Sequence, residues 1–392
     1  MKSLLRVTAA CTVLSLWVAS AVPQSAPTPP SRQTAALVAG DDDTWTIPDR
    51  DHINEGTVTV ITAPAGGVTV IFGSDMARVL DDDNLRVLPV VGKGPVRNVV
   101  DVLYLKAIDM GIVTADMPEF YRLQYKIPDI ANRLRYIAKL YNNELHIIAP
   151  KSIHSIFDLE GKRIVAQTDV GYYAAKVVFT RLGIKATFDY RTDDARAIQK
   201  IIDGDADAYI TSTGKVFPWA RYVENQDRKL HLVSVPYDRR LQDLYLPSTF
   251  SADEYPNLLE PGETIDTIAT SVLLVSFNWP ENTDRYSRVA KFVDAFFSKI
   301  DEFYKPPRHP KWKESSISIQ IPGWTRFKAA QDWLDHHNAT AVIDTGQASG
   351  SITPSSQEFK QFVNQRTNRH NLSPDDVVKL YNEFVEWSRN KH

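Results

Sequence analysis

Two glycine-rich turns, each between an apolar run and a helical pattern, constrain the fold of this chain more than any other feature. The turns are residues 62–69 and 92–95, and the flanking apolar runs and helical patterns span residues 58–61, 71–80, 87–91 and 96–103. Each unit predicts a strand, a tight turn and a helix, because glycine permits sharp turns and the first turn of a helix presents unpaired N–H groups. Two such turns at one edge of a parallel sheet would form a cradle for an anion.

Strand and helix patterns alternate from Gly56 to about Tyr304, which predicts an α/β fold with a parallel or mixed sheet and helices on both faces. A weak internal repeat indicates two such units. Residues 107–114 and 205–211 are each a short turn with an aspartate that leads into a buried strand. Two similar units predict two lobes with a cleft between them.

The apolar runs Leu145–Ala149 and Ile265–Val275 flank the second unit, and we expect them to be the strands that cross between the lobes. The second lobe would then be an insertion into a discontinuous first lobe. The predicted bounds are residues 1–21 for a signal peptide, 22–55 for a flexible leader, 56–150 with 265–336 for lobe 1, 151–264 for lobe 2, and 337–392 for a linker and helical tail.

Four further helices are predicted from apolar periodicity and from residues that favour helix starts. They are residues 173–182 after a turn at 168–172, residues 284–304, residues 324–336, and a last helix that begins at Ser373.

The N-terminus has the pattern of a secretory signal. Lys2 and Arg6 precede the apolar stretch Val7–Val18, and Ala19-Ser20-Ala21 offers small residues for cleavage near Ala21. The stretch is shorter than the roughly 20 residues of a membrane span, so we expect an exported, periplasmic protein. Cys11 is the only cysteine and lies in a poor context for lipidation, so the mature chain would have no disulfide and no thiolate chemistry.

Nothing in the composition indicates nucleic acid as a partner, since the formal net charge is -3. The nine histidines have no metal-ligand spacing, and no nucleophile elbow, zinc-protease or phosphate-loop motif occurs. Paired carboxylates such as Asp193-Asp194 resemble helix starts. The sequence therefore predicts no catalytic residue, no cofactor and no metal, which favours binding over enzymatic activity.

Six segments, in order, resemble the TAXI-type solute-binding proteins of tripartite ATP-independent periplasmic (TRAP) transporters. They are Pro64-Ala65-Gly66-Gly67, Gly92-x-Gly94-x-x-Arg97-Asn98, Asp109–Val113 with Asp116, Asp158–Ile164, Asp203–Ala208, and Tyr255-Pro256 with the strand at 265–275. The resemblance covers about residues 56–336. It implies a two-lobed periplasmic-binding fold of type II with mixed sheets, here with a C-terminal helical extension.

The resemblance also implies delivery of an organic solute to an ion-driven permease, without catalysis. This chain departs from the family in three places. Gly92–Pro95 stands where the family usually has a Thr-x-Gly-Ser turn, Ile321–Trp324 replaces a His-Pro-Gly stretch, and the tail from about Asn338 is additional.

The ligand-binding residues predicted in the first lobe come from the two turns and from a strand end. They are Gly66, Gly67, Val68, Thr69, Lys93, Gly94, Arg97, Asn98 and Asp116. The glycines would expose N–H donors, although a tight turn alone also requires them. Lys93 would pair with a carboxylate or stay solvated, and Arg97, unfavourable at a helix start, would bind an anion or form an ion pair between lobes. Asn98 is expected to brace the turn, and Asp116 to bind an amine or close the lobes.

The second lobe is expected to contribute a turn, an aromatic wall and a row of hydroxyls. These residues are Thr168, Val170, Gly171, Tyr172, Tyr173, Thr211, Ser212 and Thr213. Tyr173 fits the core equally well, and the three hydroxyls would bind a carboxylate or hydroxyl group of the ligand or cap the next turn.

Together these features predict a binding protein that captures a small organic anion or amino acid in a cleft between two lobes. Its partners would be the solute and the permease subunits of a TRAP transporter. One alternative is a sensory subunit that presents the solute to a membrane signalling protein. A second is an enzyme on the same fold, such as a porphobilinogen deaminase-like catalyst, which the lack of a reactive cysteine and of a poised base disfavours.

Overall fold

The computed structural model describes residues 54–344, apart from residues 66, 83, 168, 169, 193, 218, 219, 221, 222 and 224–228. The predicted signal peptide, the leader up to residue 53 and the tail from residue 345 lie outside the described residues. So do Gly66 and Thr168 of the predicted site.

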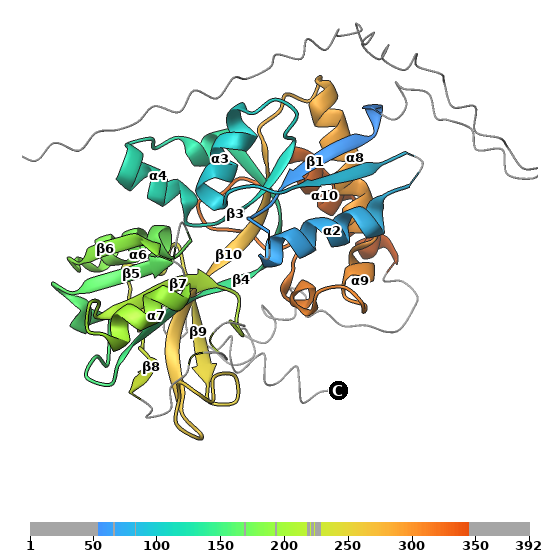
Figure 1. Ribbon diagram of the computed structural model, residues 1–392. Coiled ribbons are helices and arrows are strands. Elements are labelled where there is room, and N and C mark those ends of the chain that lie inside the picture. The colour runs from blue at the N-terminus through green and yellow to red at the C-terminus, as the bar shows by residue number, and fades with distance from the viewer. Residues whose placement is uncertain are drawn as a thin grey trace, which may run out of the picture. The chain divides into compact units, whose positions relative to one another are not determined.

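A ten-stranded mixed sheet organises the described residues (Figure 1). Its strand order is β2-β1-β3-β10-β4-β7-β5-β6, with β8 paired to β4 and β9 paired to β10. The strands are β1 Thr57–Ile61, β2 Arg86–Val90, β3 Met110–Thr114, β4 Leu134–Pro150, β5 Arg163–Gln167, β6 Thr187–Thr192, β7 Ala208–Thr213, β8 Leu230–Leu232, β9 Leu246–Ser251 and β10 Thr264–Phe277.

Helices connect the strands and cover the sheet (Figure 1). They are α2 Val68–Leu80, α3 Pro95–Tyr104, α4 Met117–Tyr125, α5 Ile130–Arg133, α6 Val170–Leu182, α7 Asp194–Ile202, α8 Asp284–Ser298, α9 Ile300–Phe303 and α10 Lys328–Asp344, with the short 3-10 helices η1 Ile156–Leu159 and η3 Pro310–Glu314.

Two long antiparallel strands join two parallel half-sheets. We call β2-β1-β3 the first half-sheet and β7-β5-β6 the second half-sheet, because the strands within each group are parallel. β10 pairs with β3 at one end and with β9 at the other, and β4 pairs with β10 and then with β7. The predicted two-lobed α/β class is confirmed. The runs predicted to cross, 145–149 and 265–275, lie in β4 and β10, the two strands that join the half-sheets, although the run at 145–149 itself pairs with β7 and β8.

The pairing of β4 with β10 contains two register shifts, between Val272 and Leu273 and between Leu274 and Val275. At the first shift Leu140 of β4 has no register partner, so β4 carries an extra residue there. Such β-bulges bend the strand locally.

Apolar cores cover opposite faces of the sheet. The neighbours Ile112 and Val113 of β3 belong to different buried clusters, and successive strand residues point to opposite faces. Helices α3, α4 and α6 contribute to the cluster of Val113, whereas α2, α8 and α10 contribute to that of Ile112. The predicted coverage by helices on both faces is therefore confirmed.

Three predicted helices have different bounds in the structure. The helix predicted at 284–304 is divided into α8 and α9, because Lys299 leaves helical geometry with φ -106 and ψ 16. The helix predicted from Trp324 begins at Lys328, since Gly323 turns with φ 73 and the Trp324 indole N–H donates to Ala115 O at 2.9 Å. It continues to Asp344, into residues predicted as linker.

The helix predicted from Tyr173 begins at Val170, so part of the predicted turn at 168–172 is helical. The close approach of Gly171 to β7 accompanies this start, and apolar periodicity alone does not reveal it.

Candidate functional site

The carboxyl ends of the two half-sheets point toward each other along β4. The last residue of β3, Thr114, is in register with Val272 of β10, which is in register with Tyr141 of β4. The last residue of β7, Thr213, is in register with Glu144 of β4. Since β3 and β7 run in opposite directions, about 10 Å of β4 separates their ends at about 3.3 Å per residue. Ligands of α/β sheets bind at the carboxyl ends of strands, so the candidate site lies at this gap.

A run of polar residues occupies the gap in two mostly apolar strands. β4 carries Asn142, Asn143 and Glu144 here, and Asn142 and Asn143 are in register with Ser271 and Thr270 of β10. Thr270 is 2% exposed, and its hydroxyl has no hydrogen-bond partner in the part of the chain that the structure describes. Buried polar groups normally have partners, so these residues are a candidate floor for a bound polar molecule.

The two glycine-rich turns lie against each other at the end of the first half-sheet. The N–H of Thr62 donates to the carbonyl of Val90 at 2.8 Å. The Asn98 amide donates to the carbonyls of Thr62 at 3.0 Å and of Ile112 at 2.9 Å, so Asn98 braces the strands. A methyl group on Gly92 would lie 2.3 Å from the Thr62 oxygen, which only glycine avoids.

The other residues of these turns start helices. Thr69 Oγ1 accepts a hydrogen bond of 2.8 Å from the N–H of Ala63, which closes the first turn. Gly67 stands immediately before α2, of which Val68 is the first residue. Gly94 has φ 106 and immediately precedes α3. The backbone donors of both helix starts are thus held at the end of the half-sheet.

The two predicted cations of the second turn are differently placed. Lys93 is exposed. Arg97 is also exposed and pairs with Asp101 one helical turn later, at 2.9 Å. This ion pair gives Arg97 a role within α3, and its contact with a solute stays a prediction.

Asp116 is buried between the two half-sheets. Its carboxylate accepts hydrogen bonds from Thr114 Oγ1 at 2.5 Å and from the phenol of Tyr245 at 2.8 Å. Tyr245 belongs to the segment between β8 and β9, so the bond joins the two predicted lobes. Burial raises the pKa of Asp116, and the two hydrogen bonds act in the opposite direction.

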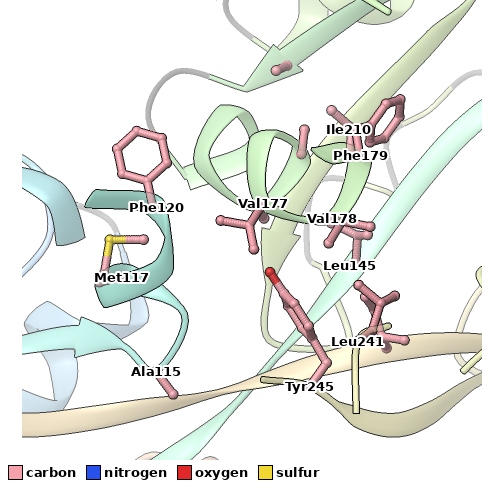
Figure 2. Packing of buried hydrophobic residues seen from close by; sticks show 14 of the residues in the cluster. Ala115, Met117, Phe120, Leu145, Val177, Val178, Phe179, Ile210, Leu241 and Tyr245 are labelled. Atoms are coloured by element: carbon pink, nitrogen blue, oxygen red, sulfur yellow. The ribbon is translucent and has the colours of Figure 1, made fainter. Parts of the chain in front are cut away.

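Helix α4 packs directly against α6, as Figure 2 shows for Phe120 and Met117 opposite Val177. The ring of Phe120 lies 4.7 Å from that of Tyr173, measured between centroids. Tyr173 therefore belongs to this apolar contact, one of the two interpretations that the sequence left open.

Ion pairs border this contact. Glu119 of α4 accepts from Arg181 of α6 at 2.7 Å and from its own neighbour Arg122 at 2.6 Å. Arg181 also pairs with Asp243 at 3.1 Å. One guanidinium therefore connects α4, α6 and the segment that carries Tyr245.

The start of α6 lies against β7. A methyl group on Gly171 would be 2.3 Å from the carbonyl oxygen of Ile210, so the close approach requires glycine. Val170 is half-buried, and the ring of Tyr172 stacks on that of Tyr190 at 4.5 Å. The ring of Tyr172 thus packs along the outer strand β6, and its contact with a solute stays a prediction.

The three predicted hydroxyls lie at the end of β7. Thr211 and Ser212 are buried and in register with His146 and Leu145, whereas Thr213 is half-buried and faces the gap position of β4. Of these three, Thr213 is therefore the best placed to meet a solute.

A buried carboxylate and histidine lie beside these hydroxyls. Glu144 is 3% exposed, accepts a hydrogen bond from the Lys215 N–H at 2.7 Å, and has a pKa that burial raises to about 7. His146 is fully buried, lies 2.6 Å from the phenol oxygen of Tyr255, and has a pKa that burial lowers to about 3. His146 is therefore neutral at physiological pH.

Lys311 of η3 reaches across to the second half-sheet. Its side chain passes so close to Gly214 that a methyl group there would lie 2.4 Å from Lys311 Cε. Its ammonium pairs with Glu314 at 2.7 Å and lies 5.7 Å from the centre of the Tyr141 ring. Glu314 in turn accepts from the N–H of Asn142 at 3.0 Å, which places this pair over the gap.

The sequence interpretation missed the gap residues of the long strands and the charges of η3. The run Asn142-Asn143-Glu144 in an apolar strand was a usable signal, because a buried strand needs a reason to carry three polar residues. Nothing local marks Lys311 or Glu314, which follow a proline-rich segment and meet β4 only in the folded protein.

The fold and the site define a two-lobed α/β protein whose half-sheets direct their carboxyl ends toward a common polar gap. The chain belongs to the NMT1-like family, which matches residues 60–309. Comparison with curated protein sequences gives no match.

Several solved structures are similar over most of their length. A TctC solute-binding protein from Polaromonas is 15% identical with a TM-score of 0.40, covering 72% of this chain and 88% of that chain. The periplasmic VFT2 domain of Bordetella pertussis BvgS is 10% identical with a TM-score of 0.38, covering 64% and 92%. An amino acid ABC transporter substrate-binding protein of Streptococcus pneumoniae, bound to L-arginine, is 13% identical with a TM-score of 0.37, covering 64% and 92%. Similarities this low do not bear on what this chain binds.

Within the described residues, no helix combines the length and apolar character needed to cross a membrane. The same residues contain no group of three histidine, cysteine or acidic side chains arranged to hold a metal ion.

Proposed function

We propose that this protein is an exported solute-binding protein that captures a small organic anion or amino acid between its two lobes. Membership of the NMT1-like family and the two opposed half-sheets support this proposal. We further propose the TAXI-type role that the sequence resemblance implies: delivery of the solute to the permease subunits of a TRAP transporter in the periplasm, without catalysis.

One observation carries the proposal: the carboxyl ends of β3 and β7 meet at a polar interruption of two buried strands. A structural role alone does not require Asn142, Asn143, Thr270 and Ser271 at the same level of two paired strands. A polar solute between the strand ends would bind such groups.

Binding would then be coupled to the arrangement of the lobes. A solute in the gap would contact both half-sheets, so it would favour the state in which their ends are close. The bond between Asp116 and Tyr245 and the pair between Glu119 and Arg181 lie at the same junction and would be made in that state. We propose the predicted lobe bounds, 56–150 with 265–336 and 151–264, as the two moving parts.

A thermal-shift screen of the chain from about Val22 onward tests the proposal. The panel contains amino acids, 2-oxoacids, dicarboxylates and aromatic acids, with sugars as neutral compounds. A solute at about 100 times its Kd stabilises the protein by about 2.7 kcal/mol.

Thr213→Val should reduce the shift, because it removes a hydroxyl at the gap. The matched control is Thr187→Val in β6, an exposed position in the same half of the molecule. If no compound shifts the Tm of the wild-type protein, the proposed function is contradicted. If a compound shifts the Tm of both variants equally, the proposed site is contradicted.

A further inference from the structure

One buried lysine beside the candidate floor has no partner for its ammonium within the described residues. Lys139 lies on β4 and is 8% exposed. In the part of the chain that the structure describes, its ammonium has no hydrogen-bond or ion-pair partner, although its backbone pairs with Ser316. An ammonium that is largely removed from water without a partner costs free energy, so its presence calls for an explanation.

Lys139 lies at the level where the first half-sheet ends. It is in register with Leu273 of β10, which is in register with Val113, the residue before the end of β3. Its side chain therefore starts beside the gap between the two half-sheets.

The charges around Lys139 leave room for one more negative group. Burial lowers the pKa of Lys139 and is the largest influence on it. The negative charges of Glu314 and Glu144 raise this pKa, and the positive charge of Lys311 lowers it further. Glu314 is already bound by the Lys311 ammonium at 2.7 Å and by the Asn142 N–H at 3.0 Å. The Glu144 carboxylate is bound by the Lys215 N–H at 2.7 Å.

Glu144 compensates Lys139 only in part. The pKa of Glu144 is raised to about 7, so near neutral pH this carboxyl group is protonated in a large share of the protein molecules. Both carboxylates near Lys139 are thus already bound by other donors, and within the described residues neither forms an ion pair with the Lys139 ammonium.

We propose that Lys139 binds the carboxylate of the solute, and that the solute class is therefore a carboxylate-bearing molecule. This inference rests on the proposed solute-binding function and deepens it. The carboxylate would take the partner position at Lys139 that the protein itself leaves open, and would be held in addition by the polar residues of the gap. Lys139 is thus the residue that determines specificity for charge.

The inference predicts opposite effects of one substitution on stability and on binding. Lys139→Met keeps much of the side chain's length and removes the buried charge. The Tm of the protein without solute should therefore rise, because an uncompensated charge is lost. Affinity for a carboxylate should fall by about 10-fold or more, which is about 1.4 kcal/mol. A lysine with a purely structural role would not produce this combination.

The experiment measures thermal shifts with pairs of compounds of similar size and shape, in which a neutral amide replaces the carboxylate: pyruvate and pyruvamide, benzoate and benzamide, succinate and succinamide. The wild-type protein should respond to at least one carboxylate and not to its amide, and Lys139→Met should lose that response. The matched control is Lys313→Gln, which changes an exposed lysine of the same 3-10 helix as Lys311 and should keep the response.

The outcomes separate the inference from the function. A carboxylate response that persists in Lys139→Met, or a wild-type response confined to neutral compounds, would overturn the inference and leave solute binding intact. A fall in the Tm of Lys139→Met without solute would also count against it, since the lysine would then stabilise the fold. No response of the wild-type protein either to these compounds or to the wider panel described above would overturn the proposed function and the inference with it.

Discussion

The phenol of Tyr245 donates a hydrogen bond of 2.8 Å to the carboxylate of Asp116, across 129 residues of sequence. The bond joins the segment before β9 to the start of α4, so two parts of the chain that belong to different predicted lobes share one buried polar contact. Asp116 is 1% exposed, and its only other side-chain partner in the described chain is Thr114.

Removal of this phenol should destabilise the protein. Tyr245→Phe leaves the aromatic packing in place and deprives the buried carboxylate of a donor, which costs about 1–3 kcal/mol. Urea unfolding of the variant and of Tyr125→Phe, an exposed tyrosine on α4, measures the effect. The control should stay within about 0.5 kcal/mol of the wild type. Equal stability of the two variants would show that the bond contributes nothing.

Glu144 should make the protein less stable as the pH rises. Its pKa is 4.5 when unfolded and about 7 when folded, so the folded state holds the proton more tightly between these values. The free energy of unfolding should therefore fall from about pH 4.5 to about pH 7, by up to about 3 kcal/mol at 1.36 kcal/mol per pH unit.

Glu144→Gln removes this dependence and leaves that of its neighbour His146. The pKa of His146 is lowered to about 3, so its contribution to the free energy of unfolding rises with pH up to about 6.5, opposite to that of Glu144. This contribution is the same in both proteins. Urea unfolding at pH 5 and pH 8 measures the free energy of unfolding of both proteins. The value for Glu144→Gln, relative to that of the wild type, should be higher at pH 8 than at pH 5. A difference that is the same at both pH values would rule out the raised pKa.

The two ion pairs of Arg181 should differ in strength. Its partner Glu119 is buried, with 7% of the side chain exposed, whereas Asp243 is 59% exposed. Double-mutant cycles with Arg181→Gln measure each coupling. The pair with Asp243→Asn should couple by about 0.2–1 kcal/mol, as exposed pairs do. The pair with Glu119→Gln should couple more strongly because less water screens it, and the reverse order would contradict this account.

Three glycines should respond to alanine according to the space around them. Gly92→Ala and Gly171→Ala place a methyl group 2.3 Å from a backbone oxygen, and each should cost more than about 2 kcal/mol. Gly67→Ala meets its nearest atoms at 3.3 Å with a permitted φ of -77, so it should cost about 1 kcal/mol or less, mainly for the altered helix start. Thermal unfolding of the three variants compares them directly, and a large loss in Gly67→Ala alone would refute the steric argument.

The parts of the fold that sequence reasoning predicted are those with a local cause. The turns around Gly67 and Gly94 separate strands from helices in the chain itself, so their periodicity and glycines were sufficient. The crossing strands were predictable because strands buried on both faces are rich in apolar residues along most of their length.

The parts that it missed depend on contacts between distant residues. Lys139 looks like one polar residue in an apolar run, and only the register with Leu273 and the approach of η3 place it at the floor of the site. Helix ends such as Ser298 were misplaced because capping geometry, not apolar pattern, decides them.

The extra residue Leu140 in β4 has a mechanical consequence. A bulge interrupts the ladder of hydrogen bonds between two strands, bends the bulged strand and increases its local twist. We expect the two half-sheets to pivot about the backbone beside Leu140, one residue from Lys139 and one from Tyr141. A pivot so close to the binding floor would leave the position of the ammonium almost fixed while the strand ends approach. The charge that selects a solute would thus be set before the lobes move, and the movement would add only the contacts from the second half-sheet.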